Sequence, residues 1–334
     1  SYLKYLNMLI IFPLIFYFNK CIDIKYKKIS LNVKICFFSI LLLSPTVRTL
    51  LIWPYPFIWA LTFFVISLYF YLKFENTVKN NKKIISAYLN VFFLALSAYF
   101  TPNFSVFAIY FFYRYFLVYG VSKKIICIFF LNVLIALPAI YFVIVKDFYL
   151  FNSSVYEIDS STKYNLSNKI IIITTIIILF FIPLFPILQK TKFLLSKKNF
   201  FEFKFFAILI FVLLNIFYFN FSKNAGGGIF FHLSNILFDN YILVYIVFLL
   251  SLILFYILNL YNFNNIIIFI LLILYNMQFS IYYKYFDPLM IFIILFLIKF
   301  KNDYKIKLEK FYREYLIFYV IFLGLNLLKV NISY

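Results

Sequence analysis

Two apolar stretches, residues 266–275 (IIIFILLILY) and residues 289–297 (LMIFIILFL), decide the fold class. Between them stands YYKYFDP, residues 282–288, with one lysine and one aspartate. Similar apolar runs recur along the 334 residues, of which 66% are hydrophobic and 13% charged. A water-soluble protein needs a larger charged share to cover its surface, and many of these runs approach the roughly 20 residues that cross a bilayer. We therefore predict an all-α, polytopic transmembrane helical bundle.

Hydropathy predicts about twelve spans within a single integral-membrane domain, residues 1–334. They lie near residues 3–18, 34–45, 49–72, 84–101, 104–120, 125–146, 169–189, 205–221, 236–258, 266–281, 289–300 and 314–330. The first apolar run is interpreted as a span, because no cleavage signal follows it. The three cysteines show no spacing typical of a disulfide or metal framework.

The basic residues predict the orientation. If the chain crosses the membrane at every span, 23 of its 31 Lys and Arg residues fall on one side. Short cytoplasmic loops are enriched in Lys and Arg, so this side is predicted to be cytoplasmic, in a bacterial inner membrane. The N-terminus and YYKYFDP then face outward. A net charge of +20 spread over such loops indicates contact with anionic membrane lipids rather than nucleic acid.

Two cytoplasmic stretches are predicted to be interfacial helices. Residues 303–315, DYKIKLEKFYREY, place aromatic side chains on one helical face and lysines on the other. Residues 192–204, KFLLSKKNFFEFK, do the same less regularly. Basic amphipathic helices of this kind lie along an anionic leaflet, and binding of a partner protein is the alternative.

Arg48 is one of three arginines and lies at the outer end of a span, followed by an aromatic and proline-rich stretch. Its planar guanidinium could hold a phosphate with two parallel hydrogen bonds. The alternative is an arginine that reaches the membrane interface beside an aromatic belt.

The longest outward loop, residues 147–168, carries three acids, Asp147, Glu157 and Asp159. Carboxylates can act as a general base or bind a divalent metal ion. No histidine accompanies them, so no metal ligands are assigned, and a solvated loop is the alternative. Asp147 is kept as a candidate catalytic acid.

The outward stretch SKNAGGGIFFHLSN groups three of the five glycines, Gly226, Gly227 and Gly228. A glycine triplet in a glycine-poor chain indicates a backbone with positive φ or a close approach to a ligand. His232, the only histidine, follows near the start of the next span. Asp239 is predicted deeper within that span, where an ionisable residue is a functional candidate.

In YYKYFDP, Lys284 and Asp287 are three residues apart on an outward turn. They could simply pair with each other, with the tyrosines forming an aromatic belt. In the functional interpretation, Lys284 contacts a phosphate while Tyr283 and Tyr285 line a headgroup or sugar site. Asp287 is then a further candidate acid.

Two stretches resemble the GT-C superfamily of integral-membrane glycosyltransferases. Residues 44–74, SPTVRTLLIWPYPFIWALTFFVISLYFYLKF, resemble its outward proline-containing turn followed by a span, and residues 282–298, YYKYFDPLMIFIILFLI, resemble its late outward turn. Dolichyl-type glucosyl- and mannosyltransferases are the most similar members. The resemblance implies transfer of a sugar from a polyprenyl-phosphate donor to a lipid-linked, glycan or protein acceptor on the outer face, with a divalent metal as a possible cofactor.

The family's catalytic carboxylate usually lies in the first outward loop, whereas no acid here precedes Asp23. We therefore expect the N-terminal portion of the protein to be missing from this chain, and no catalytic residue is carried over. Arg48, His232 and Lys284 remain candidate anion contacts. The alternatives are an outer-face polymerase or ligase of lipid-linked glycans, a transporter or flippase, and a scaffold subunit.

Overall fold

Helices make up nearly all of the regular secondary structure in the computed structural model, and no strand occurs in the residues that it describes. This confirms the helical fold class. The structure describes residues 2–26, 30–53, 55–145, 165–184, 203–222, 226–257, 260–276, 280–300 and 308–332.

Contacts within the chain divide it into two compact units. Unit 1 comprises residues 1–155 and 319–334, and unit 2 comprises residues 156–318. The single domain expected from the sequence stays a prediction. The helices before residue 155 are α1 (Tyr2–Leu9), α2 (Ile11–Lys25), α3 (Leu31–Leu43), α4 (Pro45–Ile52), α5 (Phe57–Asn76), α6 (Asn80–Phe100), η1 (Pro102–Val106), α7 (Phe107–Tyr119) and α8 (Lys123–Val145).

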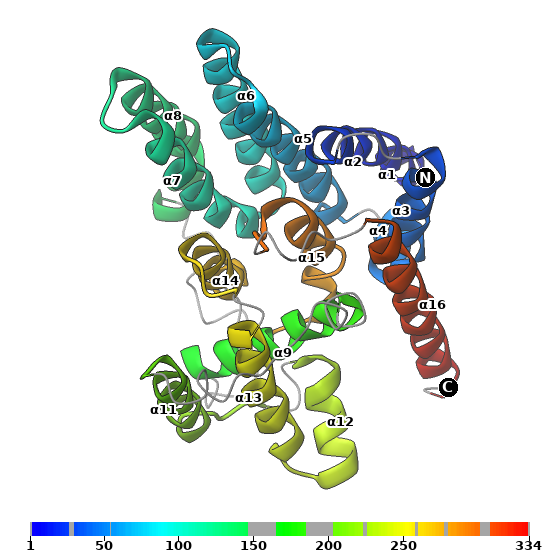
Figure 1. Cartoon of the computed structure of the whole chain (residues 1–334). Helices are drawn as coiled ribbons and strands as arrows, with labels where there is room; N and C mark the ends of the chain where they lie inside the picture. The colour runs from blue at the N-terminus through cyan, green and yellow to red at the C-terminus, as the bar shows by residue number, and fades with distance from the viewer. Residues whose placement is uncertain are drawn as a thin grey trace. The chain divides into compact units, whose positions relative to one another are not determined.

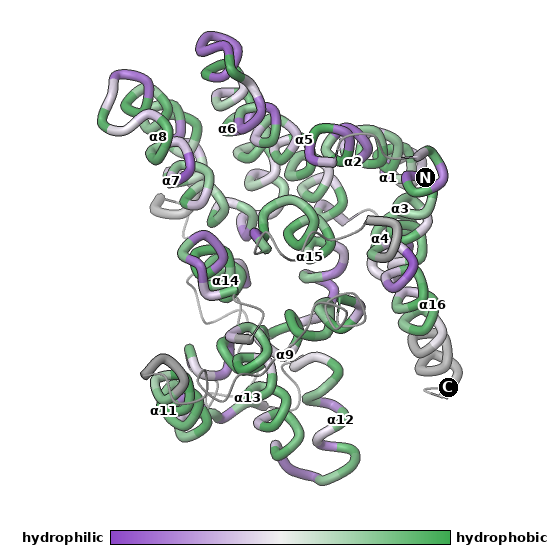
Figure 2. The backbone as a smooth tube through the Cα atoms, viewed as in Figure 1, coloured by the Kyte–Doolittle hydropathy of each residue, from purple (hydrophilic) through white to green (hydrophobic). Residues whose placement is uncertain are grey.

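Unit 1 is organised around α5, which packs along α6 and α2 (Figure 1). A buried polar pair joins α5 to α6: Asn90 Nδ2 donates to the carbonyl and to the hydroxyl of Ser67, at 2.8 and 2.7 Å. Hydrophilic residues gather where α5 leads into α6 and where α7 leads into α8 (Figure 2). The apolar helix bodies and polar connections agree with the predicted pattern of spans and basic loops.

Unit 2 is organised around α9 (Leu166–Phe181) and the short η3 (Ile182–Leu184). Twelve of the sixteen residues of α9 are buried, because α11, α12, α13, α14 and α15 all contact it. The elements around it are α11 (Phe203–Phe217), α12 (Gly228–Phe238), α13 (Ile242–Ile257), α14 (Phe263–Tyr275), η6 (Tyr283–Tyr285), α15 (Leu289–Phe292) and the π-helical η7 (Ile293–Leu297). A helix that is apolar on all sides is expected at such a central position.

The helix formed by α15 and η7 is short and fully enclosed. Every residue from Leu289 to Ile298 is at most 3% exposed. Nine helical residues extend about 14 Å, less than half of a hydrocarbon core of about 30 Å. Its end is fixed by Asn265, which exchanges two hydrogen bonds of 2.9 Å with the backbone of Lys299. The sequence predicted a span here, near residues 289–300, but this helix is too short to cross a bilayer by itself.

Five helices among the described residues are long and apolar enough to cross a membrane: Tyr5–Lys25, Phe57–Asn76, Asn80–Phe100, Lys123–Tyr141 and Leu166–Leu184. Each coincides largely with one predicted span. The count of twelve is not confirmed, since the predicted spans 205–221, 236–258 and 266–281 coincide with the shorter apolar helices Phe206–Phe217, Ile242–Tyr256 and Phe263–Tyr275. A fourth short apolar helix, Gly228–Phe238, lies mostly in the segment that was predicted to be an outward loop before residue 236.

The predicted span end at residue 45 falls at a sharp turn of the chain, whereas the predicted span 49–72 begins inside α4 and is interrupted before α5. Helices α3 and α4 would count as a sixth span, but they meet at an angle of 67°. Ser44 stands at this bend and its hydroxyl accepts a hydrogen bond from the Val47 amide at 3.1 Å, so it caps α4. At the C-terminal end of α4, the Asn7 amide nitrogen donates hydrogen bonds to the carbonyls of Leu50, Leu51 and Trp53.

The predicted interfacial helix lies partly in α16 (Leu308–Ile332), which also covers the predicted span 314–330. Its aromatic side chains Phe311 and Tyr315 are fully buried, and the Tyr315 hydroxyl donates to the Phe180 carbonyl. These rings therefore pack against protein, whereas the sequence predicted that they face lipid. Residues 192–202 of the other predicted interfacial stretch lie outside the described residues, and α11 begins at Phe203.

Candidate functional site

The outward turn YYKYFDP is compact and places alternate side chains in different surroundings. Backbone amides of Phe286 and Asp287 both donate to the Tyr283 carbonyl, at 2.9 and 3.2 Å. Lys284 is exposed, whereas Tyr285 is 8% exposed and Asp287 is fully buried. The peptide bond between Asp287 and Pro288 is cis, and α15 begins directly after it.

Lys284 lies over two neighbouring aromatic rings, whose centres are 6.3 Å apart. Its ammonium is 5.2 Å from the ring centre of Tyr282 and 5.4 Å from that of Tyr285. A cation held over ring faces at these distances is stabilised by about 0.5–1 kcal/mol at an exposed site. The turn therefore presents a positive charge flanked by aromatic surface, which suits an anionic group attached to a sugar or an apolar chain.

Beneath Lys284, Tyr283 and Asp287 point into the protein. The Tyr283 ring stacks on Phe180 with the ring centres 5.2 Å apart. Burial raises the pKa of Tyr283 well above its ordinary value, and the charges of Asp287 and Tyr315 raise it further. Tyr283 is thus a neutral phenol at physiological pH. Asp287 is enclosed in this conformation, so a substrate reaches its carboxylate only if the turn moves.

The glycine triplet adopts the conformation expected of it, with φ angles of 93° at Gly226, 115° at Gly227 and 77° at Gly228. The Gly227 amide donates to the Ile281 carbonyl at 2.9 Å. A Cβ on Gly226 would lie 2.4 Å from that carbonyl oxygen. The glycines therefore permit a close approach of backbone to backbone. In this way the structure joins the glycine turn to the start of the Lys284 turn.

His232 and Asp239 lie on α12, which begins at Gly228. His232 is exposed, and its ring meets Phe231 edge to face. Asp239 was predicted inside a span at residues 236–258, but it is exposed and follows the last residue of α12. Its φ of 47° is left-handed, a conformation that ends a helix and that aspartate tolerates better than most residues. The chain turns here, and α13 packs back along α12.

The remaining predicted residues are not part of this turn. Arg48 is exposed in the first turn of α4 in unit 1. Asp147 lies outside the described residues, together with loop residues 146–164. Among the described residues, no three His, Cys, Asp or Glu side chains gather where they could hold a metal ion.

Lys169 was not predicted from the sequence as a site residue. Lys169 lies in the first turn of α9, is 3% exposed, and donates a hydrogen bond to the Asn276 carbonyl. The Asn276 amide in turn donates to the Ser280 carbonyl at 2.9 Å, at the beginning of the Lys284 turn. A charged residue at the edge of an apolar run could have signalled such a role, since ionisable groups in these positions need partners.

The assembled site consists of the Lys284 turn, the glycine turn that contacts Ile281, and the Lys169–Asn276 pair that fixes the beginning of the turn. Compared with known proteins, the chain matches no family model, and no curated protein or solved structure matches it significantly.

Proposed function

We propose that the chain is a membrane glycosyltransferase that uses a polyprenyl-phosphate sugar as donor on the outer face of the membrane. The observation that carries this proposal is the exposed Lys284 ammonium over the rings of Tyr282 and Tyr285. An ammonium attracts a phosphate, and aromatic faces pack against sugar rings and apolar chains. The glycine turn supports this role because it fixes the start of the Lys284 turn through Ile281.

In the proposed reaction, an acceptor hydroxyl attacks the anomeric carbon of the donor sugar. The bond from that carbon to the phosphate oxygen breaks, and the electron pair leaves with the polyprenyl phosphate. Lys284 stabilises the charge that grows on the leaving phosphate. The acceptor proton passes to a carboxylate. Of the two described candidate acids, Asp239 is exposed and Asp287 is buried under the turn.

Donor binding tests the proposal directly. The full chain in phosphatidylcholine nanodiscs is titrated with a panel of radiolabelled polyprenyl-phosphate hexoses, and released polyprenyl phosphate is separated by chromatography. We expect Lys284→Ala to weaken binding by about tenfold or more, since a charged hydrogen bond contributes about 1.5–3 kcal/mol.

Lys25→Ala is the matched control, because the Lys25 ammonium also lies over a tyrosine ring, 5.9 Å from the centre of Tyr26. This variant should bind the donor as the wild type does. The proposal is wrong if no donor in the panel binds, or if Lys284→Ala binds as tightly as Lys25→Ala. Asp239→Asn and Asp287→Asn then identify the base by loss of turnover with donor binding retained.

A transporter or flippase for such lipids is the second candidate, and the broken helices favour it. Transporters often place their substrate sites at interrupted helices. The α3–α4 pair bends by 67°, and α15 with η7 forms a short, fully buried helix. A fluorescent polyprenyl-phosphate sugar in proteoliposomes distinguishes the two, since a flippase speeds its quenching by dithionite without forming polyprenyl phosphate.

A further inference from the structure

Unit 1 contains a basic hollow of about 510 Å³ at the connections of its helices. It lies between the beginning of α6, the end of α7 and the beginning of α8, far along the chain from the Lys284 turn. Its volume is within the range of about 300–1,000 Å³ typical of small-ligand sites. The lining residues are Val78, Asn80, Lys83, Val118, Tyr119, Ser122, Lys123 and Lys124.

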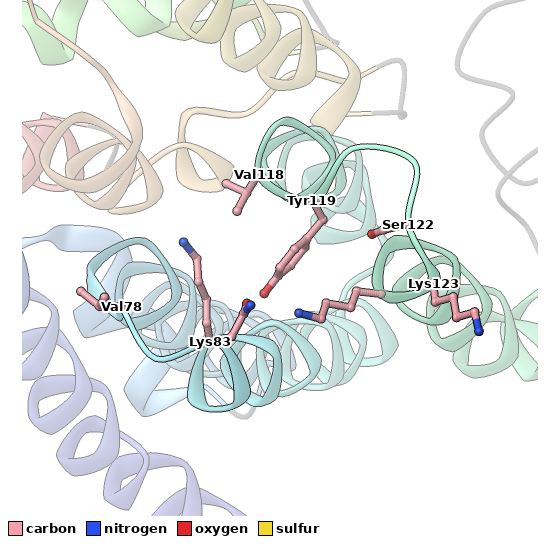
Figure 3. Close-up of a pocket in the computed structure, with 8 residues that line it drawn as sticks. Val78, Lys83, Val118, Tyr119, Ser122 and Lys123 are labelled. Carbon is pink, nitrogen blue, oxygen red and sulfur yellow. The ribbon is translucent and has the colours of Figure 1, made fainter.

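The charge of the lining is entirely positive, with three lysines and no acid. Lys83 extends into the space that faces α7, whereas Lys123 extends away from it (Figure 3). Lys124 holds its ammonium 5.3 Å from the ring centre of Tyr119, which also lines the hollow. The acid on the neighbouring end of α5, Glu75, is paired with Arg114 at 2.5 Å, and neither ion pair found among the described residues includes a lysine of the hollow.

Two helices begin at this hollow with lysines in their first turns, where the helix dipole favours negative charge. Helix α6 starts at Asn80 and α8 starts at Lys123, and neither has an acid in its first turn. The first backbone amides of a helix carry partial positive charge and lack partners within the helix. Lysines Lys83 and Lys124 therefore add like charge to both ends. A bound anion would relieve the repulsion and accept hydrogen bonds from amides at the same time.

Two partly buried residues at the hollow have hydroxyl oxygens without a hydrogen-bond partner among the described residues. The Tyr119 hydroxyl and the Ser122 hydroxyl are shielded from solvent and make no hydrogen bond to any described residue. Buried polar groups of native proteins are nearly always hydrogen-bonded, so an unfilled pair of donors beside lysines indicates a missing acceptor. Phosphate oxygens accept several hydrogen bonds at once and match both the hydroxyls and the ammonium groups.

We propose that this hollow binds a phosphate group, which either an anionic phospholipid or a small phosphate compound could supply. Charge bias predicts that this end of unit 1 is cytoplasmic, where the inner leaflet offers anionic headgroups. The ligand phosphate lies between Lys83 and Lys124, and the Tyr119 and Ser122 hydroxyls donate to it after their side chains turn toward the hollow. The proposal goes beyond the glycosyltransferase function and does not depend on it.

The test uses the full chain and two probes. Native mass spectrometry measures retention of phosphatidylglycerol against phosphatidylcholine, and calorimetry measures binding of glycerol 3-phosphate to the protein in phosphatidylcholine nanodiscs. We expect the double variant Lys83→Gln/Lys124→Gln to weaken binding of whichever probe binds by about tenfold or more, since a basic residue near an anionic lipid surface contributes about 1 kcal/mol.

The double variant Lys20→Gln/Lys73→Gln is the matched control. Both ammonium groups also lie over aromatic rings of unit 1, at 5.5 Å from Phe16 and 5.9 Å from Tyr69, but neither lysine lines the hollow. This control removes the same charge and should retain both probes. Equal thermal midpoints show that both double variants are folded.

The two probes identify the source of the phosphate. Binding of phosphatidylglycerol alone, dependent on Lys83 and Lys124, assigns the site to a lipid headgroup, and binding of glycerol 3-phosphate assigns it to a soluble phosphate. The proposal is overturned if neither probe binds, if the hollow variant binds like the wild type, or if the control variant loses as much affinity.

Discussion

Helices α8 and α9 have nearly the same apolar character but very different surroundings. Both are long and apolar enough to cross a membrane. Within an apolar stretch of 18 residues, however, 11% of the α8 residues are buried, whereas 67% are buried in the helix that contains α9. Helix α8 contacts α6 and α7 and leaves large apolar side chains such as Leu134 and Phe130 exposed, whereas five neighbouring helices surround α9. Hydropathy identifies a spanning helix, but it does not reveal whether lipid or protein covers it.

Polar side chains on α8 and α9 also differ in where their hydrogen-bond partners lie. Asn132 of α8 donates to the Ile128 carbonyl of its own helix, at 2.9 Å. Lys169 of α9 donates to Asn276, more than 100 residues away in the chain. A helix that faces lipid must satisfy its polar groups internally, while a helix inside the protein can use them to fix distant segments.

The first and largest test of this difference is chemical access. In a variant without the three native cysteines, Leu134→Cys on α8 and Ile178→Cys on α9 are exposed to a membrane-soluble maleimide. The parent side chains are 66% and 4% exposed. We expect labelling of the α8 position to be faster by at least about tenfold, because the α9 position reacts only after local opening. Equal rates would break the comparison.

A second test probes the close packing that extends from α9 to the glycine turn, where a Cβ on Gly228 would lie 2.9 Å from Ile176. Gly226→Ala should destabilise the protein strongly, because its Cβ would overlap the Ile281 carbonyl and because its φ is positive. Gly120→Ala also has positive φ but meets open space. We expect Gly226→Ala to cost at least about 1 kcal/mol more than this control in steric-trapping unfolding. A smaller cost than the control would show that the two turns do not touch.

A third test removes an aromatic ring from each helix. Phe180→Ala in α9 leaves a cavity against Tyr283, whereas Phe130→Ala in α8 removes a ring that is 63% exposed. The α9 change should lower the free energy of unfolding by about 2 kcal/mol or more, since lost packing contacts are not replaced by lipid. The α8 change should have a much smaller effect in the same unfolding measurement, and a reversed order would contradict the burial of α9.

The smallest expected effect comes from helix-to-helix hydrogen bonds. Asn90→Ala removes the bonds from α6 to Ser67 of α5, while Asn132→Ala removes a bond within α8. Bonds between membrane helices contribute about 0.6 kcal/mol on average, so Asn90→Ala should shift the unfolding equilibrium by about that amount. Asn132→Ala should be close to neutral, and a larger shift for it would show that the Asn132 amide bonds to another helix.

Local pattern predicted part of the candidate site. The glycine triplet predicted positive φ, and the Lys284 turn was located between two apolar runs, as found. The contact between these turns was not predictable, because it joins backbone groups 54 residues apart through Gly227 and Ile281. The burial of Asp287 was also missed, since a sequence places acid and lysine on one turn without showing which of them the turn encloses.

The sequence by itself determined the helical, apolar class of the protein and its alternation of apolar runs with basic connections. These follow from composition and local order, because unpaired backbone groups are too costly in hydrocarbon for anything but helices here. Only the tertiary structure decided that α9 is enclosed by other helices of unit 2 while α8 stays largely exposed in unit 1, that α15 with η7 is a short buried helix, and that α12 ends at Asp239. Lipid and protein interior are similarly apolar, so hydrophobicity cannot choose between them, and packing does.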